Sequence, residues 1–155
     1  MTLQHKHVII NLKVESPPRD SDEVEFFLAF LIKRVNMSIA KSPTLPKNPM
    51  AYYCPTIGNR GATGTGILET SHTAIHVWDE EFPATFNFDL YSCSEFEVEN
   101  VLTLCQCFDI LGGTFVVMER NDAIKIKETG TIGEDGIITE RKVYDTDKEA
   151  ARKAA

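Results

Sequence analysis

The apolar residues near the start of the chain follow two different periods, and this change of period most limits the folds open to the chain. From His7 to Val14 every second residue is apolar, which is the period of a strand with one buried face. Capping and acidic residues at 20–23 then precede apolar residues spaced three and four apart from Val24 to Ile39, as in a helix with one buried face. A strand with one apolar face is therefore followed by a helix whose apolar face can pack against it.

The remainder of the chain continues this alternation of elements. The pattern predicts a strand at 50–54 after a proline-rich loop, a glycine-rich turn at 57–66, a hairpin of strands 67–79 and 84–93, a helix that opens at the capping-box sequence 94–97 and stops at Gly112-Gly113, and a strand at 114–119. Beyond residue 121 the chain is polar, with at most a strand at 124–127. We therefore expect one α+β domain over residues 1–128 and a polar C-terminal tail over 129–155.

This order of elements predicts a two-layer α/β sandwich, with a mainly antiparallel sheet and two helices on one of its faces. The other face of the sheet is then bare. A large exposed apolar patch is uncommon on a monomer, so we expect a second copy of the chain to cover that face. A homodimer follows as the predicted oligomeric state.

Charge and apolar content exclude several classes of protein. The chain has 155 residues and a formal charge of −7, the wrong sign for a surface that neutralises phosphates, so nucleic acid is not an expected partner. Only three consecutive apolar residues follow the polar start, and the most apolar stretch, Phe26 to Ile32, has charged neighbours. We therefore predict no signal peptide and no membrane segment, a cytoplasmic location, and four cysteines present as thiols.

The residues able to do chemistry gather between positions 63 and 93. Strand alternation places Ser71 and His76 on opposite faces, and no Gly-x-Ser-x-Gly surrounds Ser71, so a serine hydrolase is disfavoured. His72 and His76 share a face and could bind zinc with Cys93 or Glu80, but no Cys-x-x-Cys or His-Glu-x-x-His accompanies them. We predict no metal. The glycines at 58–66 lack the Gly-Lys-Ser/Thr of a phosphate loop.

This region resembles the prokaryotic-type S-adenosylmethionine decarboxylases. The similarity lies in the string Gly61-Ala-Thr-Gly-Thr-Gly-Ile-Leu-Glu-Thr-Ser-His-Thr-Ala-Ile-His-Val-Trp-Asp-Glu80 and in Phe88-Asp-Leu-Tyr-Ser-Cys93. The family pattern has a Ser-His pair, a second His four residues on, a Trp and a Glu, and then an Asp four residues before a Cys. All of these are present within about thirty residues.

The resemblance implies that the enzyme makes its own cofactor. Ser71 would attack the carbonyl of Thr70, and the resulting ester would break by β-elimination to leave chains of residues 1–70 and 71–155. The new N-terminus at residue 71 would be a pyruvoyl group, which would form a Schiff base with the substrate amine and act as electron sink for loss of CO₂. The product would be the aminopropyl donor for spermidine synthesis, and neither a metal nor an added coenzyme would be needed.

The resemblance also implies roles for single residues. Thr63 takes the place of a hydroxyl residue that acts with His76 in self-processing. Cys93 matches the general acid that returns a proton to the α-carbon of the substrate. Glu80 matches the carboxylate that binds the ribose hydroxyls, and Trp78 lies beside it in the substrate-binding segment. In the family the active sites lie near a dimer interface between two sheets.

The chain departs from the family pattern at four points. Thr70 stands where most members have Glu, Asp79 stands where they have Pro, and Ile57 aligns with an aromatic residue used against the adenine. The segment from His76 to Cys93 is also two residues longer. Two alternatives therefore remain open: a pyruvoyl-dependent decarboxylase of ornithine or arginine on the same fold, and an uncleaved, non-catalytic homologue that binds a partner subunit or a polyamine.

Overall fold

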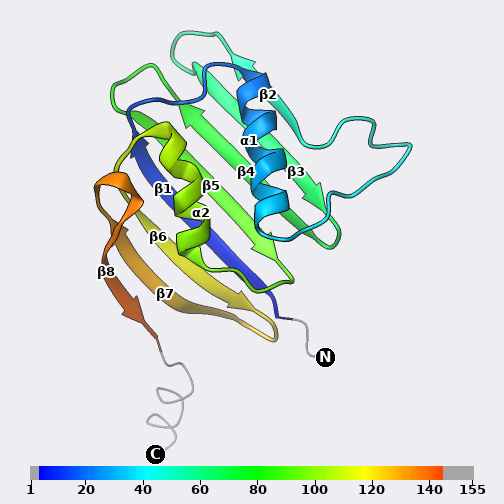
Figure 1. The fold of residues 1–155 in the computed structure, drawn as a ribbon, viewed down its shortest axis with the longest axis vertical. Helices are drawn as coiled ribbons and strands as arrows, with labels where there is room; N and C mark the ends of the chain where they lie inside the picture. The colour runs from blue at the N-terminus through cyan, green and yellow to red at the C-terminus, as the bar shows by residue number, and fades with distance from the viewer. Residues whose placement is uncertain (1–3, 145–155) are drawn as a thin grey trace, which may run out of the picture.

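The computed structural model describes residues 4–144, and its centre is one antiparallel sheet of eight strands covered by two helices on one face (Figure 1). The strands lie in the order β2-β3-β4-β5-β1-β6-β7-β8. The elements are β1 (Lys6–Val14), α1 (Ser21–Arg34), β2 (Met50–Cys54), β3 (Gly61–Leu68), β4 (Ser71–Trp78), β5 (Ala84–Ser92), α2 (Val98–Cys105), η1 (Gln106–Phe108), β6 (Ile110–Arg120), β7 (Ile124–Ile132), η2 (Glu134–Gly136) and β8 (Ile138–Val143). The predicted α+β sandwich is confirmed. Neither helix in this part of the chain is long and apolar enough to cross a membrane.

The core lies between the sheet and the two helices, as the two apolar periods predict. Alternate side chains of β1, from Val8 to Val14, are completely buried. The helix α1 begins after Asp20, whose carboxylate accepts a hydrogen bond from the backbone N–H of Glu23 at 2.9 Å. It ends at Arg34, earlier than the apolar spacing suggests, because Asn36 adopts a positive φ of 58° that no helix continues through.

The glycine-rich segment differs from the expected turn. Residues 61–66 belong to β3, where the buried Gly64 and Gly66 lie beneath α1. A Cβ atom built on Gly64 would lie 2.3 Å from Cγ1 of Val24, so a side chain there would push the helix away from the sheet. These two glycines allow close packing of helix and strand. The strand expected at 67–79 is instead broken by a tight turn, and β3 and β4 form the hairpin around it.

Three other predictions need correction. The second helix begins at Val98 after Glu97, without a side-chain cap, so the expected capping box does not form. The glycines expected to stop that helix, Gly112 and Gly113, lie inside β6. The segment 129–144, expected to begin a polar tail, contains the end of β7, the turn η2 and strand β8. The rest of the expected tail, 145–155, lies outside the described residues.

The face of the sheet opposite the helices carries the residues singled out by the sequence. Within residues 4–144, both helices cover the other face, and this one is open (Figure 1). In β4 the burial alternates: Thr73 and Ile75 are buried, whereas His72, His76 and Trp78 are exposed on the open face. The exposed apolar side chains Ile9 and Ile67 alternate in the same way along their own strands. The homodimer stays a prediction.

Candidate active site

The bond between Thr70 and Ser71 lies in the tight turn that joins β3 and β4. Leu68 pairs with Ser71 in the hairpin, so Glu69 and Thr70 are its two turn residues. Thr70 has a positive φ of 63°, which is unfavourable for a β-branched residue because its Cβ crowds the backbone. Its hydroxyl donates a 2.6 Å hydrogen bond to the carbonyl of Glu69. The peptide at the predicted cleavage point is therefore held in a strained conformation.

Cys93, just after the end of β5, contacts both residues of this bond. Its thiol donates a hydrogen bond to the carbonyl oxygen of Thr70 at 3.2 Å, and its backbone N–H donates to the Ser71 hydroxyl at 3.2 Å. The thiol is half-buried. Two of the predicted site residues, 22 positions apart in sequence, are thus brought together, with the thiol at the carbonyl that the serine would attack.

Two residues that the sequence analysis did not identify complete the surroundings of Cys93. The Nδ1 atom of His5 lies 3.7 Å from the sulfur of Cys93 and 2.5 Å from the hydroxyl oxygen of Tyr91. The ring of Tyr91 is stacked between the rings of His5 and His72, with centroid distances of 5.9 and 5.5 Å. The register of β1 and β5, in which Lys6 pairs with Ser92, brings His5 to Cys93. Only knowledge of that strand pairing could have revealed the contact.

A second polar group lies on the open face beside Tyr91. The carboxylate of Asp89 accepts hydrogen bonds from Nε2 of His7 at 2.5 Å and from Nε2 of His72 at 3.1 Å. Burial alone raises the pKa of Asp89, but its hydrogen bonds and electrostatic interactions with His7 and His72 outweigh this, so the pKa lies below its ordinary value. Asp89 therefore stays ionised and fixes the orientation of both rings.

This group also has the composition and spacing of a metal site. Within residues 4–144, the ligand atoms of His7, His72 and Asp89 lie within 4.8 Å of one another. However, Arg120 donates a hydrogen bond to Nδ1 of His7 at 3.3 Å, which puts the proton of a neutral imidazole on Nε2, facing Asp89. The nearby guanidinium also repels a cation. The geometry thus favours a hydrogen-bonded cluster of His7, His72 and Asp89. The zinc site considered from the sequence, His72 and His76 with Cys93 or Glu80, is not assembled among the described residues.

Thr63 and His76 form a separate pair farther along the same hairpin. They are paired residues of β3 and β4, and the hydroxyl of Thr63 lies 3.2 Å from Nδ1 of His76 on the open face. The ring of Trp78 lies 6.2 Å from that of His76. His76 is five positions from Ser71 along β4, which corresponds to about 16 Å in an extended strand. The structure therefore does not bring His76 to Ser71 within one chain.

Glu80 lies at the same end of the hairpin as His76. Its carboxylate accepts hydrogen bonds from the backbone N–H groups of Gly58 and Arg60, at 2.5 and 3.2 Å. It thereby holds the loop that carries Ile57, whose side chain is 91% exposed. The predicted site residues thus divide into two groups. We call Ser71 and Cys93 with Thr70 the cleavage end, and Thr63, His76, Trp78 and Glu80 the binding end.

The neighbouring Asp79 braces the binding end. Burial raises the pKa of Asp79, but hydrogen bonds from Arg60 and Tyr53 bring it below its ordinary value. The Arg60 Nε and Tyr53 hydroxyl donors each lie 2.7 Å from the carboxylate. Asp79, which replaces the family's proline, is therefore a charged residue whose hydrogen bonds connect the loop after β4 to Tyr53 of β2 and to Arg60.

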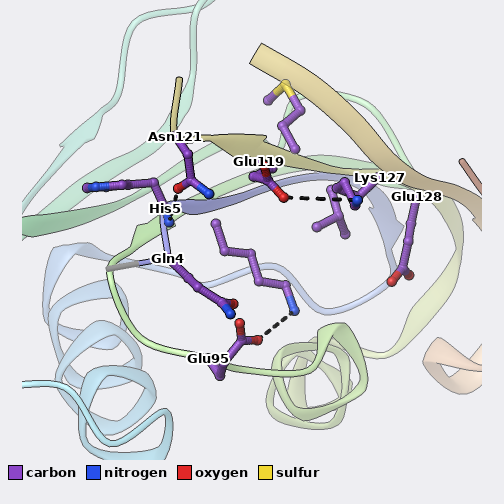
Figure 2. A pocket seen from close by; sticks show the side chains of 10 residues that line it. Gln4, His5, Glu95, Glu119, Asn121, Lys127 and Glu128 are labelled. Atoms are coloured by element: carbon purple, nitrogen blue, oxygen red, sulfur yellow. Dashed lines mark hydrogen bonds and ion pairs between the residues drawn. The ribbon is translucent and has the colours of Figure 1, made fainter. Parts of the chain in front are cut away.

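A cavity of about 170 Å³ lies at the start of β1, next to the cleavage end (Figure 2). Lys6 lies 3.8 Å from the carboxylate of Glu95, and Lys127 lies 4.0 Å from that of Glu119. The backbone N–H of His5 donates to Oδ1 of Asn121 at 3.0 Å. None of the predicted site residues lines this cavity. The hydrogen bond from His5 to Asn121 at the wall of this cavity holds the backbone of His5 in place beside the cleavage end.

The chain was compared with known protein families, and one family model matches most of its length. The sequence model of the family described as S-adenosylmethionine decarboxylase matches residues 6–108. That range includes both the cleavage end and the binding end, and it stops before β6. No curated protein matches the chain.

Proposed function

This chain belongs to the S-adenosylmethionine decarboxylase family, and on that premise we propose that it is a self-processing, pyruvoyl-dependent decarboxylase of S-adenosylmethionine. Its product would be the aminopropyl donor for spermidine synthesis. One observation carries the proposal most strongly: the thiol of Cys93 is hydrogen-bonded to the carbonyl of the peptide bond that precedes Ser71. The residue that we propose as general acid and the residue that we propose as precursor of the cofactor thus lie at the same turn.

The surroundings of Thr70 support cleavage at Ser71. Attack by the Ser71 hydroxyl on the Thr70 carbonyl carbon places negative charge on the carbonyl oxygen. The Cys93 thiol already donates to that oxygen, so it stabilises the developing charge. The positive φ of Thr70 raises the energy of the intact turn, and cleavage relieves this strain. Both features would favour processing with Thr70 in place of the family's Glu.

The residues at the turn also fit the cofactor that the family implies. A pyruvoyl group at residue 71 supplies an electron sink for the bond to the departing carboxylate. Cys93 lies beside position 71 and holds a proton for the α-carbon of the substrate. Tyr91 and His72 wall the same end of the open face, with His72 anchored by Asp89. These side chains orient the substrate and keep its reacting carbon near the thiol.

A second copy of the chain would complete the site. Within one chain Ser71 and His76 lie on opposite faces of β4 and about 16 Å apart by strand geometry, too far for a proton transfer. A two-fold interface over the open face of the sheet would bring the cleavage end of one protomer against the binding end of its partner. It would also cover Ile9, Ile67 and Trp78, which are 40%, 46% and 42% exposed.

Complementation between two inactive variants tests this composite site. We expect Ser71→Ala and His76→Ala to be uncleaved when each is made alone. Co-expression should give mixed dimers in which one of the two sites holds both Ser71 and His76, so up to all of the His76→Ala chains in mixed dimers, and none of the Ser71→Ala chains, should be cleaved. Intact mass of the purified mixture measures this, with differently tagged chains. If no chain is cleaved in the mixture, the composite site is wrong.

Ile57 gives specific support to a second candidate substrate. The family places an aromatic side chain there against adenine, whereas the exposed, aliphatic Ile57 offers no ring for stacking. A substrate without a nucleobase, such as ornithine or arginine, would not need one. We therefore keep decarboxylation of these amino acids as the alternative function of the same site.

Release of CO₂ from labelled S-adenosylmethionine, ornithine and arginine, measured side by side on cleaved protein, decides between the two. We expect S-adenosylmethionine to give the highest kcat/KM, by at least about tenfold, because Glu80 and Trp78 contribute binding that the smaller substrates cannot use. A preference for either amino acid would support the alternative. If none of the three substrates releases CO₂, the non-catalytic binding homologue would be favoured.

A further inference from the structure

Loss of CO₂ from an amino acid consumes one proton in every turnover. The C–C bond breaks, the electron pair stays with the α-carbon, and that carbon takes up a proton. If Cys93 supplies it, the S–H bond breaks, a C–H bond forms and a thiolate remains. Cys93 can act again only after a proton reaches its sulfur, so the site needs a group that carries one from solvent to Cys93.

We propose that His5 is this group: it returns a proton to the sulfur of Cys93 after each turnover. The inference rests on the proposed function and extends it, because His5 is not among the residues that the family resemblance identifies. His5 acts through Cys93 and does not touch the reacting carbon.

The contacts of the sulfur leave few other candidates. Within the described part of the chain, the polar atoms recorded in contact with Cys93 Sγ are the carbonyl oxygen of Thr70, at 3.2 Å, and Nδ1 of His5, at 3.7 Å. The carbonyl has no proton to give. Both distances are within the range of hydrogen bonds to sulfur. His5 is thus the protein group in contact with the thiol that can both accept and donate a proton.

The position of His5 suits a carrier between solvent and thiol. Its ring is only partly buried, so it can exchange protons with water. The ring stacks on Tyr91, whose hydroxyl oxygen lies 2.5 Å from Nδ1, and this contact holds Nδ1 on the side of Cys93. The other imidazoles at this end of the open face are engaged elsewhere, because His7 and His72 both interact with the carboxylate of Asp89.

The backbone of His5 is fixed on both sides. Its N–H donates to Asn121, and its carbonyl accepts a hydrogen bond from the backbone N–H of Arg120 at 2.8 Å. Figure 2 shows the His5 side chain directed away from the centre of the cavity that its backbone lines. The residue therefore presents its ring to the cleavage end although it precedes β1.

The proton transfers balance without another reactant. His5 as imidazolium gives the proton on Nδ1 to the Cys93 thiolate: the N–H bond breaks, an S–H bond forms, and neutral imidazole remains. The imidazole then takes up a proton from water or buffer. The net uptake is one proton for each CO₂ released.

The variant His5→Gln tests the relay, with Gln4→Ala as the matched control at the neighbouring position of the same cavity. We expect His5→Gln to be cleaved and to keep its KM for S-adenosylmethionine within about twofold, while kcat falls about tenfold. Added imidazole should restore part of kcat in His5→Gln only. Turnovers that protonate the wrong carbon should also increase, leaving an alanyl N-terminus on the fragment 71–155 that mass spectrometry detects.

A second measurement keeps the outcome separate from that of the proposed function. The rate at which iodoacetamide alkylates Cys93, relative to Cys54 in the same uncleaved or cleaved sample, needs no substrate. Because the nitrogen that returns the proton can also remove it, we expect His5→Gln to lower this ratio about threefold. An unchanged ratio overturns the relay whether or not the protein is an enzyme. An unchanged kcat in a cleaved, active His5→Gln protein also overturns it.

Discussion

Replacing Ser71 by alanine should leave a single chain of 17.4 kDa under conditions in which the unchanged protein separates into residues 1–70 and 71–155. The reason is chemical: alanine has no hydroxyl to attack the Thr70 carbonyl, and without the ester no elimination follows. Intact mass under denaturing conditions measures both species. The fragment 71–155 should resist Edman degradation, because a pyruvoyl group at its N-terminus has no free amine.

Ser94→Ala is the matched control for this experiment. Ser94 is exposed, lies next to Cys93 and is followed by the loop to α2, so its loss should leave cleavage unchanged. If the unchanged protein persists as one chain during long incubation, self-processing does not occur. The non-catalytic homologue would then become the better interpretation.

Replacing Cys93 by alanine should separate processing from turnover. Cleavage should become slower, because the thiol no longer stabilises charge on the Thr70 oxygen, but it should reach completion since the Ser71 nucleophile is intact. On fully cleaved protein, kcat for CO₂ release should fall by about 10²- to 10³-fold, the usual effect of losing a positioned general acid. Radiolabelled CO₂ release, normalised to the cleaved fraction, provides the measurement.

Cys107→Ala is the corresponding control, because Cys107 is an exposed thiol remote from the turn. It should leave kcat within about twofold of the unchanged protein. Normal turnover by cleaved Cys93→Ala protein would remove Cys93 from its proposed role as general acid. It would also leave His5 without a proton acceptor.

Periodic segments of the sequence predicted the sandwich well. The alternation in β1 and the three- and four-residue spacing in α1 each identify a face that must be buried, and one arrangement of layers buries both. The same alternation correctly separated Ser71 from His76. The short motif from Ser71 to Glu80 identified the family that the sequence comparison confirms.

Features that depend on contacts between distant elements could not be predicted. Gly64 and Gly66 resemble turn residues until α1 is placed above β3. The turn at Thr70 contains no glycine or asparagine, the usual sign of a two-residue hairpin loop, so the sequence does not indicate its positive φ. His5 meets Cys93 only through the register of β1 and β5. The polar strand β8 has too little apolar alternation to be distinguished from a tail.

The strand order has a consequence for the cleavage that we propose between Thr70 and Ser71. β1 belongs to the fragment 1–70 but lies in the sheet between β5 and β6, which both belong to the fragment 71–155. After cleavage the two fragments therefore cannot separate unless the centre of the sheet opens. Global unfolding of the cleaved protein would then also separate its two fragments, so the midpoint temperature of unfolding should rise with protein concentration. Refolding after denaturation would require the two fragments to associate again. The processing that we propose would therefore make the fold depend on two molecules, residues 1–70 and residues 71–155, in place of one chain.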